Sequence, residues 1–149
     1  MVRRTSFEDS DCPVARSVDA IGDWWSLLIV RDAFDGSRRF GEFQRSLGVA
    51  KNILSARLRA LVAGGVLELV PAADGSAYQE YALTAKGRAL FPVIVALRQW
   101  GESHFFDDGE PHSELLDRRD GRPLAELRVH AADGRPVAPE ETVVAKVPR

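Results

Sequence analysis

Net positive charge is confined to one short stretch of this chain, and part of that stretch has the periodicity of an amphipathic helix. Residues 37–64 carry six basic side chains and one acidic one, whereas the residues before and after them are net acidic. Residues 50–63 place apolar side chains along one helical stripe and polar ones mainly on the other, the apolar set being Ile53, Leu54, Leu58, Leu61 and Val62. The fold must therefore bury one face of this helix and expose a basic face on a protein of net charge −2.

Three short helices are predicted before this one, over residues 13–21, 23–34 and 40–47. Each has apolar residues at helical spacing, and each ends at or near a glycine, namely Gly22, Gly36 and Gly48. Pro13 suits a first helical turn, and Asp23 is placed to cap the second helix.

A hairpin and a long helix are predicted next. Residues 66–70 and 78–83 have strand character, and Asp74-Gly75 marks the tip between them. Thr84 is placed to cap a helix over residues 85–100, in which Leu90, Ile94, Leu97 and Trp100 repeat on one face. Pro92 predicts either a kink in this helix or a late first turn.

The last part of the chain has a different pattern. The tetrapeptide Asp-Gly-Arg-Pro occurs at residues 120–123 and again at 133–136, and residues 124–130 between the two copies alternate like a strand. We therefore predict a winged helix-turn-helix of the α+β class, mainly α. DNA binding and dimerisation are assigned to residues 1–110, and a small β-rich extension to residues 111–149.

This order of elements suits DNA recognition, because a helix fits the major groove while the preceding helix and the wing hold the phosphate backbone. Lys51, Asn52 and Ser55 lie in the first turns of the presumed recognition helix, where such donors address base edges. The full set of candidate DNA-contacting residues is Arg38, Arg39, Lys51, Asn52, Ser55, Arg59 and Tyr78. Each cation taken alone also fits an ordinary solvated face, and Arg57, nearer the apolar stripe, is interpreted as structural. The wing tip, residues 72–77, contains no Lys or Arg.

Other classes of protein find little support in the sequence. A single cysteine excludes an intramolecular disulfide, and the three histidines have no thiolate cluster with which to build a zinc site, so no metal and no cofactor are expected. No phosphate-binding loop, nucleophilic serine elbow or metal-spaced histidine pair is present, so we do not expect an enzyme. No apolar run approaches a membrane span, and the first residues are charged. We therefore expect a cytoplasmic protein without membrane contact, associated with the nucleoid when it is bound to DNA.

Several segments resemble, in order and spacing, the HxlR family of bacterial winged helix-turn-helix regulators, which are MarR-like in architecture. They are Cys12-Pro13-Val14-Ala15-Arg16, Ile21-Gly22-Asp23-Trp24-Trp25, Leu28-Ile29-Val30-Arg31-Asp32, Gly36-Ser37-Arg38-Arg39-Phe40, Phe43-Gln44, Ile53-Leu54-Ser55-Ala56-Arg57-Leu58 and Tyr81-Ala82-Leu83-Thr84-Ala85-Lys86-Gly87. The resemblance covers residues 11–101. It implies a homodimer on a palindromic operator, with residues 13–21 and 85–100 packed across the two-fold axis. The interface residues would be Val14, Val18, Leu90, Ile94, Leu97 and Trp100.

The resemblance also implies a regulator, and we favour a repressor because a groove-filling dimer can exclude polymerase. Two inputs stay open. Cys12 resembles a cysteine through which some members respond to oxidants, and a helix N-terminus favours the reactive thiolate, although Asp9 and Asp11 oppose it and a buried cysteine is usually a small core residue. The other input is a small apolar or aromatic effector bound by aromatic side chains, namely Trp24, Trp25, Phe34, Trp100, Phe105 and Phe106. The alternative function is a winged-helix assembly module that does not bind DNA.

Overall fold

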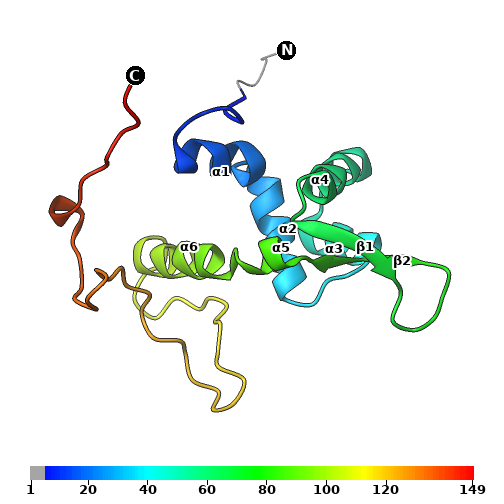
Figure 1. Ribbon diagram of the computed structural model, residues 1–149. Helices are drawn as coiled ribbons and strands as arrows, with labels where there is room; N and C mark the ends of the chain where they lie inside the picture. Colours follow the sequence, from blue (N-terminus) through cyan, green and yellow to red (C-terminus); the bar gives the residue numbers. More distant parts are fainter. Residues whose placement is uncertain (1–5) are drawn as a thin grey trace. The chain divides into compact units, whose positions relative to one another are not determined.

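The computed structural model describes residues 6–149, and the charged opening at residues 1–5 lies outside the described residues. The chain forms two compact units, one ending at Phe91 and one running from Pro92 to Arg149 (Figure 1). The division predicted from the sequence, between residues 110 and 111, stays a prediction. None of the helices among the described residues is long and apolar enough to cross a membrane.

The first unit begins with four helices, whose bounds follow the glycine and proline signals of the sequence. They are α1 (Pro13–Ile21), α2 (Trp24–Phe34), α3 (Phe40–Leu47) and α4 (Lys51–Ala63). The Asp23 carboxylate caps α2 by accepting a hydrogen bond of 3.0 Å from the backbone N–H of Ser26. The three short helices and the amphipathic helix predicted from the sequence are thus confirmed.

Helices α3 and α4 form the helix-turn-helix pair. Gly48, which follows α3, has a φ of 63°, a left-handed conformation that glycine adopts without steric cost. Its N–H donates to the carbonyl of Gln44 at 2.8 Å and closes the helix. Only residues 48–50 separate the two helices, so the turn is short enough to hold them against each other.

The wing is a two-stranded antiparallel sheet of β1 (Leu67–Pro71) and β2 (Gln79–Leu83). Leu67 lies opposite Leu83 and Pro71 opposite Gln79, so the loop between the strands spans residues 72–78. Gly75, with a φ of 76°, lies in this loop, which protrudes beyond the helices of the first unit (Figure 1). The predicted hairpin is confirmed.

The core of the first unit lies between α2, α3, α4 and β1. Helix α4 contributes Leu54, Leu58 and Leu61, which are spaced by four and three residues and are each at most 1% exposed. The fully buried large side chains are Ile29, Val30, Phe43, Leu54, Leu58, Leu61 and Leu67. Ile53, predicted on the same stripe, is 40% exposed, because the buried stripe is only one row of residues wide.

The prediction of one continuous helix over residues 85–100 is wrong. Thr84 caps a single turn, α5 (Ala85–Arg88), and a second helix, α6 (Phe91–His104), follows after a two-residue turn. Pro92 lies in the first turn of α6. A proline within a continuous helix has no N–H to donate and its ring clashes with the carbonyl four residues earlier, so the helix restarts at this point. Of the two predicted outcomes, the late first turn is correct.

The second unit joins α6 to a tail with little regular structure. The two Asp-Gly-Arg-Pro copies form similar turns, in which the aspartate side chain accepts the N–H of the arginine two residues later, at 3.0 Å for Asp120 and 3.1 Å for Asp133. Each turn is closed by an isolated antiparallel bridge, Leu116 with Pro123 and His130 with Pro136.

The strands predicted in this tail are wrong, because among the described residues after α6 only these two bridges and a short 3-10 helix (Pro139–Glu141) occur. Side chains of α6 take the place of a partner strand. Gln99 donates from Nε2 to the carbonyl of Ala125 at 3.0 Å and accepts from the N–H of Leu127 at 2.7 Å. Arg98 donates to the carbonyl of Ser113 at 3.0 Å. The tail is thus anchored through its backbone by α6.

Candidate nucleic-acid interface

The exposed face of α4 carries the predicted base-reading residues. Lys51, Asn52 and Arg59 are exposed and Ser55 is half-buried. Asn52, Ser55 and Arg59 are spaced by three and four residues, so they share one side of the helix. The sequence has no acidic residue between Glu42 and Glu68. The exposed face of α4 is therefore basic, because the helix contains no acidic side chain to offset its positive charge.

The N-terminus of α4 adds backbone donors to these side chains. Ala50 precedes the helix and its side chain cannot cap it, so the first amides of α4 have no side-chain acceptor within residues 6–149. Free amides and the positive end of the helix dipole both attract a phosphate. Lys51 lies in the same turn, so this end of α4 is suited to the DNA backbone as well as to a base edge.

Arg57 has a structural role, as the sequence indicated. Its Nε lies 3.5 Å from the Asp23 carboxylate, the group that also caps α2. The ion pair joins α4 to the start of α2, and it directs the guanidinium away from the role of a free DNA contact.

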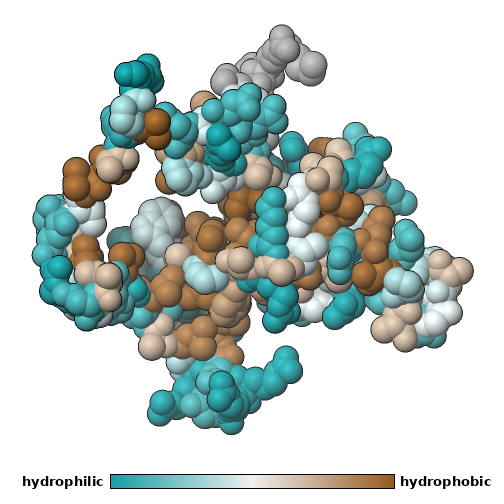
Figure 2. Space-filling model, viewed as in Figure 1, coloured by the Kyte–Doolittle hydropathy of each residue, from teal (hydrophilic) through white to brown (hydrophobic). Residues whose placement is uncertain are grey.

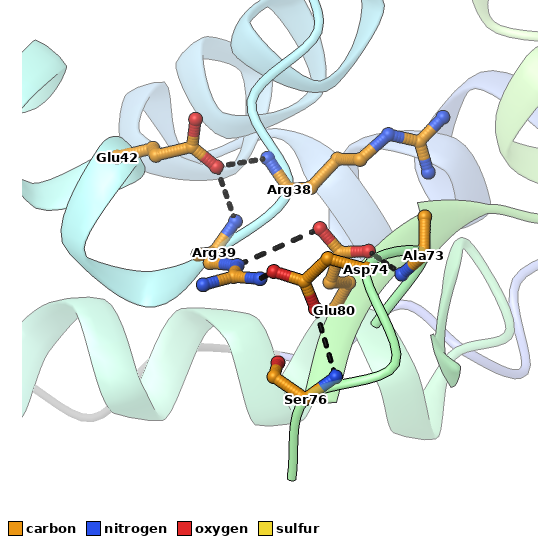
Figure 3. Close-up of polar contacts among 7 residues, drawn as sticks. All are labelled: Arg38, Arg39, Glu42, Ala73, Asp74, Ser76 and Glu80. Atoms are coloured by element: carbon orange, nitrogen blue, oxygen red, sulfur yellow. Dashed lines mark hydrogen bonds and ion pairs between the residues drawn. The ribbon is translucent and has the colours of Figure 1, made fainter. Parts of the chain in front are cut away.

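Arg39 is held by the wing, as Figure 3 shows. Its Nη2 donates to Oδ2 of Asp74 at 2.6 Å, its Nε lies 3.7 Å from Oε2 of Glu80, and its guanidinium lies 5.4 Å from the ring centroid of Tyr78. Glu80 is only 7% exposed and also accepts the N–H of Ala73 at 2.8 Å. We call Arg39, Asp74 and Glu80 the wing latch. It ties the segment before α3 to the wing loop.

The hydrogen bonds around the wing latch change the pKa values of two of its residues. Hydrogen bonds from Ser76, first its backbone N–H and then its side chain, and the bond from Arg39 lower the pKa of Asp74 to about 2. The hydrogen bond to Asp74 raises the pKa of Arg39 in turn. Both groups are therefore charged at neutral pH, as the ion pair between them requires.

Arg38 has a different environment from its neighbour. Its carbonyl accepts the N–H of Tyr81 at 2.7 Å, which places the segment before α3 beside β2. The Glu42 carboxylate accepts the N–H groups of Arg38 and Arg39, at 3.1 and 2.9 Å, and these two bonds lower the pKa of Glu42 (Figure 3). Among residues 6–149, the Arg38 guanidinium has no ion pair, and it is exposed. Arg38 is therefore the more available of the two cations.

The wing tip offers little to a phosphate. Figure 2 shows it at the right in mostly pale and tan colours, as its alanines, glycine and serine require. Tyr78 is 69% exposed, but its ring is already stacked with Arg39. The one charged side chain of the tip, Asp74, is negative, so the tip has no cation of its own.

The predicted dimer residues fall into two groups. Val14 and Val18 on α1 and Leu97 and Trp100 on α6 are exposed in the single chain, Val14 by 69% and Trp100 by 58%. Leu90 is half-buried and Ile94 is buried within its own chain, so neither offers much surface to a partner. Val93, which was not among the predicted interface residues, is also exposed, by 41%, and lies one turn before Leu97 on α6.

The residues proposed for regulation are only partly brought together. Cys12 is exposed directly before α1, so in the single chain it is not a core residue. The aromatic side chains pair as Trp24 with Trp25, Phe34 with Phe91, and Trp100 with Phe105, at centroid distances of 6.3, 5.4 and 5.1 Å. Trp24, Trp25 and Phe34 lie on α2, Trp100 lies on α6, and the effector site stays a prediction. In the described part of the chain, no group of three or more His, Cys, Asp or Glu could hold a metal ion.

Comparison with known proteins places this arrangement among transcription regulators. Residues 20–108 match the family model described as HxlR-like helix-turn-helix. The "uncharacterized HTH-type transcriptional regulator Rv3095" of Mycobacterium tuberculosis is 43% identical over 117 residues, which cover 78% of this chain and 66% of that protein. The chain thus spans slightly less than two thirds of the length of such curated relatives.

Solved structures agree with the sequence comparison. The crystal structure of PA1607, described as a candidate transcription factor, superposes with a TM-score of 0.90 at 59% identity, over 96% of this chain and 100% of that one. The oxidised form of the redox regulator HypR superposes with a TM-score of 0.58 at 33% identity, over 64% of this chain and 100% of that one. The winged helix fold is shared with both.

Proposed function

The chain belongs to the HxlR family of helix-turn-helix transcriptional regulators, and from this premise we propose that it is a homodimeric repressor that binds a palindromic operator. The exposed basic face of α4 is the observation that carries the proposal. Lys51 and Asn52 lie in its first turn and read bases, because lysine donates to guanine and asparagine pairs bidentately with adenine. Ser55 and Arg59, further along the helix, contact a flanking base or the phosphates.

The phosphate contacts are divided unequally between the two arginines before α3. Arg38 is exposed and has no ion pair among the described residues, so it is the first phosphate ligand. Arg39 is occupied by Asp74 and Glu80 of the wing latch, so it is less available to a phosphate than Arg38. Tyr78 contributes its hydroxyl at the edge of the same surface.

Two apolar surfaces support dimer formation. Val14 and Val18 expose apolar surface on α1, and Val93, Leu97 and Trp100 do so on α6. Exposed apolar rows on helices mark interaction surfaces in soluble proteins. We therefore propose that α1 and α6 form the dimer interface, where a partner protomer would cover these apolar rows.

DNA binding is tested with the purified protein and the intergenic region upstream of its own gene, by fluorescence anisotropy at two salt concentrations. We expect sequence-selective binding that weakens with salt. Asn52→Ala or Lys51→Ala lowers specific affinity about 5- to 150-fold, the value of a bidentate base contact, and leaves the dimer intact. Lys146→Ala, which removes an exposed cation of the tail, is the matched control. Unchanged affinity in both α4 variants contradicts the assignment of α4, and absence of any salt-sensitive binding favours the assembly module.

Regulation through Cys12 is a second proposal with its own test. The thiol is exposed at the N-terminus of α1, a helix proposed for the dimer interface, so an adduct or an intersubunit disulfide at this position would disturb the dimer. A thiol oxidant then abolishes operator binding by the unaltered protein and not by Cys12→Ser. Equal inhibition of both proteins contradicts a sensing role.

A further inference from the structure

A hollow of about 290 Å³ opens on the first unit beside α1. Its apolar surface comes from three separate parts of the unit: α1, the residue before β1, and the turn that follows α5. The lining residues are Arg16, Ser17, Ala20, Ile21, Val66, Lys86 and Leu90. Val66 is buried, and Ile21 and Leu90 are half-buried, so the floor of the hollow belongs to the folded core.

The floor is held in place by the packing of α5. The carbonyl of Val66 accepts the N–H of Thr84 at 3.1 Å and the Thr84 hydroxyl at 3.2 Å. Gly87 is buried so closely against Val66 that a Cβ at its position would lie 2.1 Å from the Val66 carbonyl oxygen. The hollow is therefore preformed, and a ligand would not have to open it.

Both charged groups of the hollow are cations without a carboxylate partner. Lys86 donates from Nζ to the carbonyl of Gly64 at 2.7 Å, and Arg16 donates from Nε to the carbonyl of Ser10. Neither forms an ion pair anywhere within residues 6–149, and no acidic side chain lines the hollow. Carbonyl oxygens satisfy hydrogen-bond donors and leave the positive charge in place. Two uncompensated cations thus lie at the edge of an apolar floor.

We propose that this hollow binds a small organic anion with an apolar body, and that this anion is the effector of the regulator. The carboxylate pairs with Arg16 and Lys86, and the apolar body covers Ala20, Ile21 and Val66. The volume lies at the lower limit of small-molecule sites, about 300–1,000 Å³, which favours a single-ring ligand over a larger one. The binding claim stands independently, and the effector claim rests on the proposed function.

The position of the hollow explains how such a ligand would act on DNA binding. It contacts α1, which we assign to the dimer interface, and Val66, which directly precedes β1 of the wing. A ligand that touches both elements changes the equilibrium between their arrangements by the difference in its affinity for each.

Binding is tested on the full chain without DNA, by calorimetric titration with benzoate and with its neutral counterpart benzamide. We expect benzoate to bind and benzamide to bind at least about tenfold more weakly. Arg16→Gln with Lys86→Gln lowers benzoate affinity about tenfold or more. Ala20→Phe does so by filling the hollow while keeping both charges. Arg88→Gln, which removes an exposed cation of α5 outside the hollow, leaves benzoate affinity unchanged.

Three results overturn the ligand site. They are no benzoate binding up to millimolar concentration, equal binding of benzamide, and unaltered benzoate binding in the Arg16 and Lys86 double variant. If the unaltered protein binds no benzoate and the double variant changes the dimer dissociation constant, the hollow is instead occupied by a second copy of the chain.

The effector role is read from operator affinity, which saturating benzoate should change about fivefold or more in the unaltered protein and not in the double variant. An operator affinity that benzoate leaves unchanged overturns the effector role. Benzoate binding in a protein that binds no DNA under any condition instead refutes the proposed function and leaves the ligand site standing.

Discussion

Neutralising Asp74 should strengthen DNA binding, because the wing latch holds a cation that a phosphate could otherwise use. Asp74 holds Arg39 through a bond of 2.6 Å, and the other carboxylate of the latch, Glu80, is more distant at 3.7 Å. Asp74→Asn removes the negative charge from the wing tip. It keeps an oxygen to accept the Ser76 N–H, a bond of 2.9 Å, so the turn is preserved.

The magnitude follows from counterion release. Each phosphate neutralised by a cation contributes about −0.9 to the slope of log affinity against log salt. If Arg39 of each protomer gains one phosphate, the slope of the dimer becomes steeper by about 1.8. Between about 50 and 200 mM salt, Asp74→Asn then loses about tenfold more affinity than the unaltered protein, and it binds more tightly at the low-salt end.

The assay is fluorescence anisotropy of a labelled operator across that salt range, with three further variants. Arg39→Ala alone and Arg39→Ala combined with Asp74→Asn should have the same slope. Among residues 6–149, Arg39 is the only cation paired with Asp74, so Asp74→Asn releases no other cation. Asp133→Asn is the matched control. It neutralises an exposed aspartate that pairs with Arg135 at 3.4 Å in the tail, outside the candidate interface, and it should leave the slope unchanged. A weaker Asp74→Asn protein with a flatter slope would refute the reasoning and show that the wing latch positions the wing for DNA.

Three further outcomes are expected. Trp100→Glu places a charge on the exposed row of α6 and should raise the dimer dissociation constant at least about tenfold in analytical ultracentrifugation, as the loss of a buried interface tryptophan does. An unchanged dissociation constant contradicts the proposed interface. Gly87→Ala should lower the free energy of unfolding by about 1–3 kcal/mol in urea denaturation, because the new Cβ meets the Val66 carbonyl. Gly101→Ala, which has open space around its Cβ, should not lower the free energy of unfolding, and equal effects of the two changes contradict this account of the packing. The pKa values of Asp74 and Glu42 are lowered from 3.8 and 4.5, so the stability that these carboxylates contribute is present above about pH 4.5 and is lost as the pH falls toward 2. The urea midpoint of Asp74→Asn should therefore fall less with acid than that of the unaltered protein, and an equal fall contradicts the contribution of Asp74.

Much of the fold of the first unit was predictable, because its signals are local. Helix starts and ends depend on residues a few positions apart, such as the Asp23 cap and the Gly48 turn, and such short-range preferences are encoded directly in the sequence. The exposure of Lys51, Asn52 and Arg59 followed in the same way from helical periodicity. The tail was less predictable, since alternation alone does not supply a partner strand, and side chains of α6 took that place.

The candidate site was predicted in composition but not in organisation. Arg39 and Asp74 are separated by 35 residues, so the wing latch depends on how β2 packs beside the segment before α3. The sequence did contain one signal that was overlooked, a glutamate three residues after Arg39 at the start of α3, which is typical of a helix N-terminus. Nothing comparable pointed to Glu80, because a carboxylate on a strand is normally exposed.

The sequence by itself determined the helix-turn-helix and wing, the basic face of α4 and the family of the protein, because all of these depend on spacing within short segments. Only the tertiary structure decided which cations are free. Arg38 and Arg39 are adjacent and chemically identical, yet one guanidinium is exposed without an ion pair among the described residues and the other lies between Asp74 and Glu80. Tertiary packing also joined Arg16 and Lys86 at one hollow. The physical reason is that a charge acts through its distance to other charges, and for residues far apart in sequence that distance is set by the folded chain.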